Sequence, residues 1–411
     1  MLHKINIYDM LCYLRRESIE RNGQDMSVDD IPKRKARRVV GLVLLLAVLG
    51  LVAFVIFFLV SNDSSGAMRL TGLFSRRSSV ITVDEFNFDI GRERVFANLD
   101  GSIAAAGTLG IMVLDTEGQE ILRDSFRMNT PAIRSSGNSF IAFDIGGSAV
   151  RVYQSTQVVS LVETDGTVVS ASINNNGWFC IVTQEAGSTR GIVSVYNSRG
   201  VLVYRVNKAT GFVLSAELSH DNKKLAVLNL TETGSRISLY HDIDTEEEPF
   251  EIFDRYGGLI IDIKYLPNGN VLAISTNSLF LVDNDGEGLM LYTFADKRLG
   301  GYAHSNDFIA LHLYDFGVGY QGRLITIDHE GTVLGENSFN REIISMSAVN
   351  RSLVVLRSDG VIFYNEELEE FPVLAENISV AGASRILAIS NYTAVATSDN
   401  SAVVVRRGEE Q

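Results

Sequence analysis

The fold can be predicted from one repeated kind of segment, of which the run Leu324-Ile325-Thr326-Ile327-Asp328-His329-Glu330-Gly331 is a clear copy. It is a short apolar segment that ends at an Asp, followed by two polar residues and a Gly. An Asp side chain can accept a hydrogen bond from the backbone two residues further on, and Gly adopts a positive φ without strain. The run therefore predicts a β-strand that enters a tight hairpin.

The same D/N-x-x-G unit recurs along the chain about every forty residues. Clear copies lie at residues 112–118, 193–200 and 279–286, and weaker copies lie near Tyr153, Tyr240, Tyr364 and Val404. Upstream of these hairpins, a polar turn precedes a very apolar strand at residues 98–101, 174–177, 219–222 and 266–269. Together the two signals give four short strands per unit. An all-β fold made of such evenly repeated units is predicted to be a β-propeller.

The two ends of the array predict how the ring closes. The last unit supplies only three strands, at residues 386–389, 393–397 and 402–406, while residues 80–88 form a strand without a unit of its own. Pairing the two ends would remove both open sheet edges, which otherwise invite aggregation. The sequence therefore favours eight blades, the eighth completed by the N-terminal strand. Seven blades are the alternative if residues 366–390 are irregular.

An uncharged stretch, residues 39–60, precedes the array and predicts one transmembrane helix. At a rise of about 1.5 Å per residue its 22 residues would extend roughly 33 Å, which matches a hydrocarbon core of roughly 30 Å. Residues 1–38 hold nine Lys or Arg, against three in residues 61–80, so the N-terminus is expected to be cytoplasmic. A cleaved signal peptide is the alternative, but the apolar run is long and no A-x-A site follows.

Four segments follow from this interpretation: a basic cytoplasmic tail (1–38), a transmembrane helix (39–60), a linker (61–79) and an extracytoplasmic propeller (80–411). The expected location is the cell membrane, with a single pass. Beyond the span the chain carries 27 basic and 44 acidic residues, a charge that argues against a nucleic-acid partner. Cys12 and Cys180 would lie on opposite sides of the membrane, and Cys180 is expected to be a buried apolar side chain.

Over roughly residues 80–411 the repeats resemble those of WD40-like and quinoprotein-like propellers. The Gly-His and Trp-Asp dipeptides of WD40 repeats are absent, and Trp178 is the only tryptophan. The tryptophan-docked blades of quinoprotein dehydrogenases are therefore absent too, so no pyrroloquinoline quinone or other cofactor is expected. The plan of a basic tail, one span and a propeller resembles an uncharacterised family of membrane-anchored propeller proteins of Gram-positive bacteria. That resemblance implies no activity.

No residue set predicts a catalytic or metal site. Asp283-Asn284-Asp285-Gly286-Glu287 resembles a calcium loop, but position twelve of such a loop falls on Phe294. A hairpin turn is the simpler interpretation, since other units carry the same turn without the second Asp. The six histidines show no H-E-x-x-H or H-x-H spacing, and no G-x-S-x-G occurs. The chain is therefore not expected to be an enzyme.

One loop is a candidate binding element, because it combines glycines with aromatic residues. Tyr314, Phe316 and Tyr320 lie within Tyr314-Asp315-Phe316-Gly317-Val318-Gly319-Tyr320, and Tyr302 follows Gly300-Gly301. Exposed aromatic side chains bury a large area on contact with a partner. The alternative is a long hairpin whose aromatic residues pack on their own blade.

The expected function is interaction: a scaffold or accessory subunit that presents the propeller to another envelope protein. Such a role predicts an exposed apolar or aromatic patch. The alternative is recognition of a small ligand or a cell-wall polymer in the central channel, with or without hydrolysis. That alternative predicts aromatic and carboxylate side chains in the channel, contributed by several units. Fold alone does not decide between them, because propellers host many unrelated functions.

Overall fold

The computed structural model describes residues 84–407, except for 186–190, 244–248, 254–257, 295, 318, 372–379 and 400. The predicted tail (1–38), transmembrane helix (39–60) and linker (61–79) lie outside the described residues. Within the described ranges, no helix has the length and apolar character needed to cross a membrane. The described part of the chain is built from β-strands.

The strands form eight four-stranded sheets, each antiparallel, which are the blades. Blade 1 comprises β2 (Val95–Leu99), β3 (Ser102–Gly107), β4 (Gly110–Leu114) and β5 (Glu120–Ser125). Blade 2 comprises β6 (Pro131–Ser136), β7 (Ser139–Asp144), β8 (Ala149–Gln154) and β9 (Gln157–Glu163). Blade 3 comprises β10 (Thr167–Ile173), β11 (Phe179–Gln184), β12 (Gly191–Tyr196) and β13 (Leu202–Lys208). Blade 4 comprises β14 (Phe212–Leu218), β15 (Leu225–Thr231), β16 (Gly234–Tyr240) and β17 (Phe250–Phe253).

The second half of the ring repeats this order. Blade 5 comprises β18 (Ile260–Tyr265), β19 (Val271–Ser275), β20 (Ser278–Val282) and β21 (Gly288–Thr293). Blade 6 comprises β22 (Arg298–His304), β23 (Ile309–Tyr314), β24 (Gly322–Ile327) and β25 (Val333–Phe339). Blade 7 comprises β26 (Ile343–Val349), β27 (Ser352–Arg357), β28 (Gly360–Asn365) and β29 (Glu370–Phe371). Blade 8 comprises β30 (Arg385–Ser390), β31 (Thr393–Thr397), β32 (Ser401–Arg406) and β1 (Asp84–Asn87).

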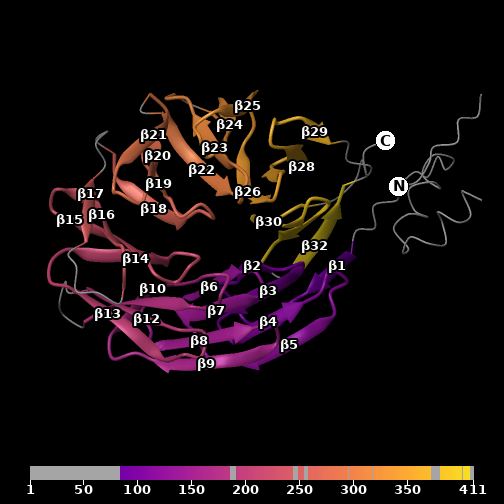
Figure 1. Ribbon diagram of the computed structural model, residues 1–411. Coiled ribbons are helices and arrows are strands. Elements are labelled where there is room, and N and C mark those ends of the chain that lie inside the picture. The colour runs from indigo at the N-terminus through magenta and orange to yellow at the C-terminus, as the bar shows by residue number, and fades with distance from the viewer. Residues whose placement is uncertain are drawn as a thin grey trace, which may run out of the picture. The chain divides into compact units, whose positions relative to one another are not determined.

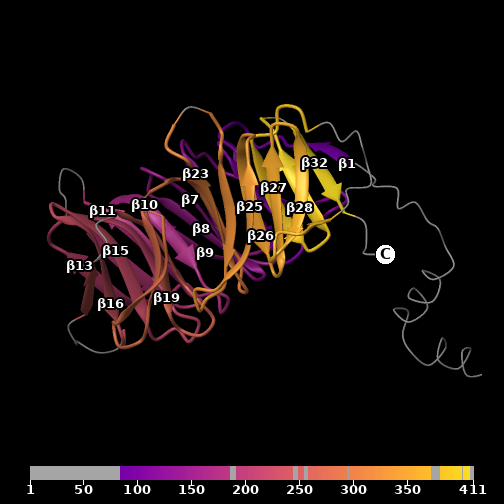
Figure 2. The same cartoon turned by 90° about the horizontal axis from the view of Figure 1, so that it is seen from above.

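The blades form a ring in which the first strand of each blade is innermost (Figure 1). First strands of neighbouring blades contact one another, as β10 does with β14, and the fourth strands form the rim. Figure 2 shows the strands of blades 6 and 7 running across the thickness of the propeller. The prediction of an all-β propeller is confirmed.

Blade 8 closes the ring as predicted from the two chain ends. Strand β1 pairs antiparallel with β32, with Asp84 opposite Val404 and Asn87 opposite Ser401. The N-terminal strand is therefore the outermost strand of a blade whose other three strands come from the C-terminus. Eight blades are confirmed, and the alternative of seven is wrong because blade 7 has its own four strands. Its outer strand β29 is described over Glu370–Phe371.

The core lies between the blades rather than within them. Eight apolar clusters are present in the described residues, one at each interface around the ring, including the interface of blades 8 and 1. Cys180 of β11 lies in the cluster that joins blades 3 and 4, and it is fully buried. Burial raises the pKa of its thiol to about 12, so the thiolate is disfavoured at neutral pH. The prediction that Cys180 is a buried apolar side chain is confirmed.

The D-x-x-G hairpins have the predicted geometry. Asp328 Oδ1 accepts hydrogen bonds from the backbone N–H of Glu330 at 3.0 Å and of Thr332 at 2.7 Å. Gly331 has a φ of +90°, in the left-handed region that Gly tolerates. The structure adds a second reason for this glycine, because a Cβ there would lie 3.3 Å from the Leu291 backbone of blade 5. The hairpin therefore fits closely against the preceding blade.

Replacing Gly331 with Ala should destabilise the propeller more than replacing Gly146 with Ala. Both glycines have similar φ angles, +90° and +83°, but a Cβ at Gly146 would have no atom within 4 Å. Left-handed strain should cost about 1–2 kcal/mol at either site, and the contact with Leu291 should add about 1 kcal/mol at Gly331. Chemical denaturation of the two variants measures the difference. Equal losses of stability would show that the close contact between the blades does not contribute to the free energy of unfolding.

Candidate functional site

The predicted aromatic loop connects β23 to β24 in blade 6. Tyr314 ends β23 and is buried against the ring of Phe339, with centroids 5.8 Å apart. Phe316 and Tyr320 are 71% and 47% exposed, and the ring of Tyr320 lies 6.3 Å from that of Tyr314. Each prediction therefore holds for part of the loop. Tyr314 packs on its own blade, while Phe316 and Tyr320 face solvent as a binding element would require.

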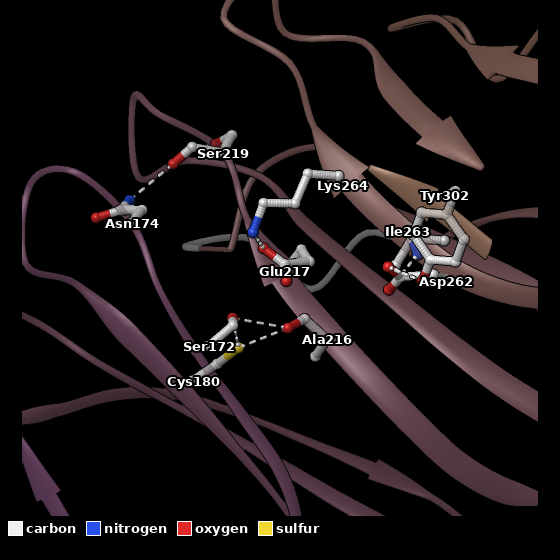
Figure 3. Close-up of polar contacts among 10 residues, drawn as sticks. All are labelled: Ser172, Asn174, Cys180, Ala216, Glu217, Ser219, Asp262, Ile263, Lys264 and Tyr302. Carbon is white, nitrogen blue, oxygen red and sulfur yellow. Dashed lines mark hydrogen bonds and ion pairs between the residues drawn. The ribbon is translucent and has the colours of Figure 1, made fainter. Parts of the chain in front are cut away.

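Tyr302 lies apart from this loop. It is in the first strand β22, and its hydroxyl donates a hydrogen bond to Asp262 Oδ2 of β18 at 2.7 Å (Figure 3). Burial, reinforced by the Asp262 carboxylate, raises the pKa of Tyr302, so the phenol stays protonated. The four residues predicted as one binding element therefore divide between an exposed loop and the wall of the channel.

The stem of the loop is held by an ion pair and borders a groove. Lys297 Nζ lies 2.8 Å from Asp315 Oδ1, and this hydrogen bond lowers the pKa of Asp315. A groove of about 470 Å³ lies beside the stem. Its lining residues are Asp315, Gln321, Gly322, Arg323, Ser338, Phe339 and Asn340.

The loop lies on the face of the propeller where the first strands begin, which we call the entry face. Antiparallel pairing puts the connections between second and third strands on this same face. Six further apolar side chains of this face are more than a third exposed: Leu109, Ile145, Phe212, Leu259, Ile261 and Ile344. Other exposed apolar side chains lie along the fourth strands, such as Leu161 of β9. The entry face therefore adds exposed aliphatic and aromatic surface from several blades to that of the loop.

A second set of side chains converges in the channel, where it comes from four blades. We call it the channel cluster, and its members are Arg134 (β6), Glu217 (β14), Asp262 and Lys264 (β18) and Tyr302 (β22). Lys264 Nζ lies 3.3 Å from Glu217 Oε2, beside the hydrogen bond of Tyr302 to Asp262 (Figure 3). Residues up to 168 positions apart in the chain are thus brought into one site.

Burial and charge act in opposite directions within the channel cluster. Burial raises the pKa of Glu217, and the neighbouring Lys264 and Arg134 oppose that shift. His304, two residues after Tyr302 in β22, has its pKa lowered to about 4, mainly by burial, so it is neutral at physiological pH. The channel therefore holds two carboxylates, two cations and neutral hydrogen-bonding groups within a partly desolvated space.

Sequence reasoning identified only Tyr302 of the channel cluster. The signal that was available is a charged residue inside an apolar strand, as in Val213-Leu214-Ser215-Ala216-Glu217 and Ile260-Ile261-Asp262-Ile263-Lys264. Such residues are costly to bury and often have a specific partner. Each strand alone, however, gives no indication of which other blade supplies that partner.

The acidic turn beside β20 is a hairpin turn in the structure. Asp283 Oδ1 accepts hydrogen bonds from the backbone N–H of Asp285 at 2.9 Å and of Glu287 at 2.8 Å. In the described parts of the chain, no group of three or more His, Cys, Asp or Glu side chains is arranged to hold a metal ion.

Known structures and sequences relate the chain to propellers. It is 13% identical to the C-terminal WD40 domain of Sif2, with a TM-score of 0.58 over 80% of this chain and 99% of that one. It is 13% identical to the WD40 domain of SCAP from fission yeast, with a TM-score of 0.53 over 80% and 98%. At these identities the similarity shows the fold alone. No curated protein sequence matches the chain. Residues 77–369, most of the propeller, match a family model, and the chain therefore belongs to DUF5711, a family of unknown function.

Proposed function

We propose that this protein is an interaction scaffold or accessory subunit, anchored in the cytoplasmic membrane and displaying its propeller to another protein of the cell envelope. The proposed role is binding rather than catalysis. The observation that carries it is the exposed pair Phe316 and Tyr320 on a loop of the entry face. Aromatic residues of this kind dominate the energetics of protein interfaces.

The loop has features that suit a binding element. Buried Tyr314 and the ion pair of Lys297 with Asp315 hold its stem, so less conformational entropy is lost when a partner binds. The neighbouring groove offers polar groups that could surround an aromatic contact, as in the polar rim of typical interfaces. The exposed aliphatic residues of the entry face extend the surface beyond blade 6.

The proposed membrane location rests on sequence. The uncharged residues 39–60 are long enough to span a bilayer, and the excess of Lys and Arg before them favours a cytoplasmic N-terminus. The propeller would then lie outside, on a linker of residues 61–79. A strongly acidic propeller suits a protein partner better than an anionic polymer.

Site-specific crosslinking in the native cell tests this proposal. A photoreactive phenylalanine analogue replaces Tyr320 on the entry face, and in a second strain it replaces Tyr392 in the turn between β30 and β31. The two tyrosines are matched, since they are 47% and 48% exposed, but they lie on opposite faces of the propeller. We expect position 320, and not position 392, to trap one envelope protein.

The substitution Phe316→Ala should reduce that crosslink at least tenfold, because an anchor residue at the centre of an interface contributes 2 kcal/mol or more, by order of magnitude. The same adducts from both positions, or no protein adduct from position 320, would contradict the proposal.

A further inference from the structure

The first strands repeat a pattern of polar side chains that shows which residues the fold itself requires. Five of these strands carry a register shift near their start, and the first residues after it are Ser170, Ser215, Asp262, Gly301 and Ser345. Two residues further along the same strands lie Ser172, Glu217, Lys264, Ala303 and Ser347. Each set of five forms one layer of the ring, because its members hold the same position relative to the register shift in their strands. Small residues are the rule in both layers, and the charged residues are exceptions.

The serines of these layers join neighbouring blades. Ser347 Oγ accepts a hydrogen bond from the Ala388 N–H at 3.0 Å, which links blades 7 and 8. Ser345 Oγ accepts one from the Ile386 N–H at 3.2 Å, and Ser172 Oγ donates one to the Ala216 carbonyl at 2.8 Å. A hydroxyl group is therefore sufficient for contact between first strands at these positions.

Blades 4 and 5 place charged groups where serine would suffice. The Glu217 and Lys264 side chains are only 14% and 32% exposed, so both are partly desolvated. A buried ion pair seldom stabilises a fold more than a well-packed uncharged pair would. Asp262, Glu217 and Lys264 therefore replace the small residues found at these layers in other blades, and a gain in stability does not explain the replacement. Departures of this kind from a repeat are typical of functional sites.

The channel cluster also has unused hydrogen-bonding capacity. Among the described residues, Arg134 donates one hydrogen bond, from Nη1 to the Ile133 carbonyl at 3.1 Å, and Lys264 donates one, to Glu217. Glu217 Oε1 accepts no hydrogen bond from the described residues. Arg134 is exposed although it lies in the middle of a first strand, so solvent reaches this level of the channel. A small molecule entering the channel would therefore find both donors and acceptors.

The charges of the channel cluster indicate what kind of ligand it would accept. Two cations, Arg134 and Lys264, balance two carboxylates, Glu217 and Asp262, so the set has no net charge to attract a polyanion or a polycation. A charged ligand would also compete with the ion pair already present. A hydroxyl group, which donates and accepts at once, can bond to a carboxylate and a cation without adding charge.

We propose that the channel cluster binds a small, uncharged, polyhydroxylated molecule, a sugar or polyol. This site is separate from the aromatic loop of the entry face, and it adds a ligand to the interaction role. Glu217 would accept hydrogen bonds from ligand hydroxyls, and Arg134 and Lys264 would donate to them. Asp262, which accepts a hydrogen bond from Tyr302, would keep strands β18 and β22 in position beside the ligand.

Saturation-transfer NMR on the full-length chain in lipid nanodiscs tests the proposal. The probes are glucose, N-acetylglucosamine, maltose and inositol, compared with their charged counterparts glucose 6-phosphate and glucosamine. We expect saturation transfer to at least one neutral probe and at least fivefold less to the charged ones. Transfer to none of the neutral probes, or stronger transfer to the charged ones, would overturn the proposal.

The double substitution Glu217→Ser with Lys264→Ser tests whether the neutral probe binds at the channel cluster. It inserts the residue that β10 and β26 carry at the same layer, and it leaves neither charge unpaired. Binding of the neutral probe should fall at least tenfold while the thermal unfolding transition is kept. The control Glu120→Ser with Arg123→Ser removes an ion pair of 2.7 Å on β5, the outermost strand of blade 1, where both side chains are more than a third exposed, and should leave binding unchanged.

A second variant keeps the test decisive if the double substitution impairs folding. Asp262→Asn preserves side-chain volume and a partner for the Tyr302 hydroxyl, but it removes one carboxylate from the balanced set. It should weaken binding of the neutral probe at least threefold. Unchanged binding in every folded channel variant would place the ligand elsewhere and overturn the proposal.

Discussion

Deletion of residues 1–91 will abolish the cooperative unfolding transition of the propeller, whereas deletion of residues 1–79 will preserve it. The longer deletion removes β1 and leaves β32 with an unpaired edge. It also removes Phe88 and Ile90, which are 4% and 2% exposed and pack with Val404 in the cluster between blades 8 and 1. Losing two such core side chains costs about 5–10 kcal/mol, which is comparable to the whole stability of a typical domain.

The two deletions form a matched pair, because both lack the apolar residues 39–60 and differ only in the closing segment. Thermal unfolding followed by circular dichroism, together with size-exclusion chromatography, distinguishes them. The longer deletion should aggregate or elute as an expanded species, since an open sheet edge invites pairing with another chain. Identical melting curves for both proteins would show that blade 8 does not need its N-terminal strand.

The substitution Phe140→Ala should lower the free energy of unfolding by about 3–5 kcal/mol. Phe140 is the second residue of β7 and is fully buried in the cluster between blades 1 and 2. Its ring stacks on Tyr153 of β8, with centroids 4.5 Å apart and an interplanar angle of 7°. Alanine would leave a cavity and remove this contact, and the cross-strand neighbours cannot fill the space because backbone pairing holds them.

The matched control is Phe316→Ala, which makes the same chemical change at a side chain that is 71% exposed. It should change stability by no more than about 0.5 kcal/mol. Guanidinium denaturation of the two variants measures both effects. A small loss for Phe140→Ala would mean that the interface between blades 1 and 2 adjusts to the missing ring. A large loss for Phe316→Ala would mean that its aromatic ring supports the loop rather than facing a partner.

Most of the propeller was predictable because its information is local and repeated. The Asp328 turn needs only an acceptor side chain two residues before the backbone N–H that donates to it, and a glycine with positive φ, so a short run of residues is sufficient. Repetition of that run about every forty residues implies blades. The unpaired strand at one end and the missing strand at the other then imply closure, which β1 and β32 confirm.

The candidate sites were less predictable for reasons that are also physical. Tyr314, Phe316 and Tyr320 were identified together because they are close in sequence, but only Tyr314 is buried, where it packs against Phe339 of β25. Tyr302 was grouped with them on sequence, yet its partner Asp262 comes from the neighbouring blade. A hydrogen-bond partner from another strand cannot be inferred from spacing along one strand.

The architecture, meaning the strand repeat, the turn chemistry and the strand that completes the ring, could therefore be predicted from the chain alone. Those features depend on neighbours within a few residues, or on a pattern that recurs many times. Which side chains meet in the channel followed only from the folded ring, because ring closure brings together strands that are far apart in the chain. The ion pair of Glu217 with Lys264 exists only when blades 4 and 5 are packed. Its energy depends on the burial that this packing creates.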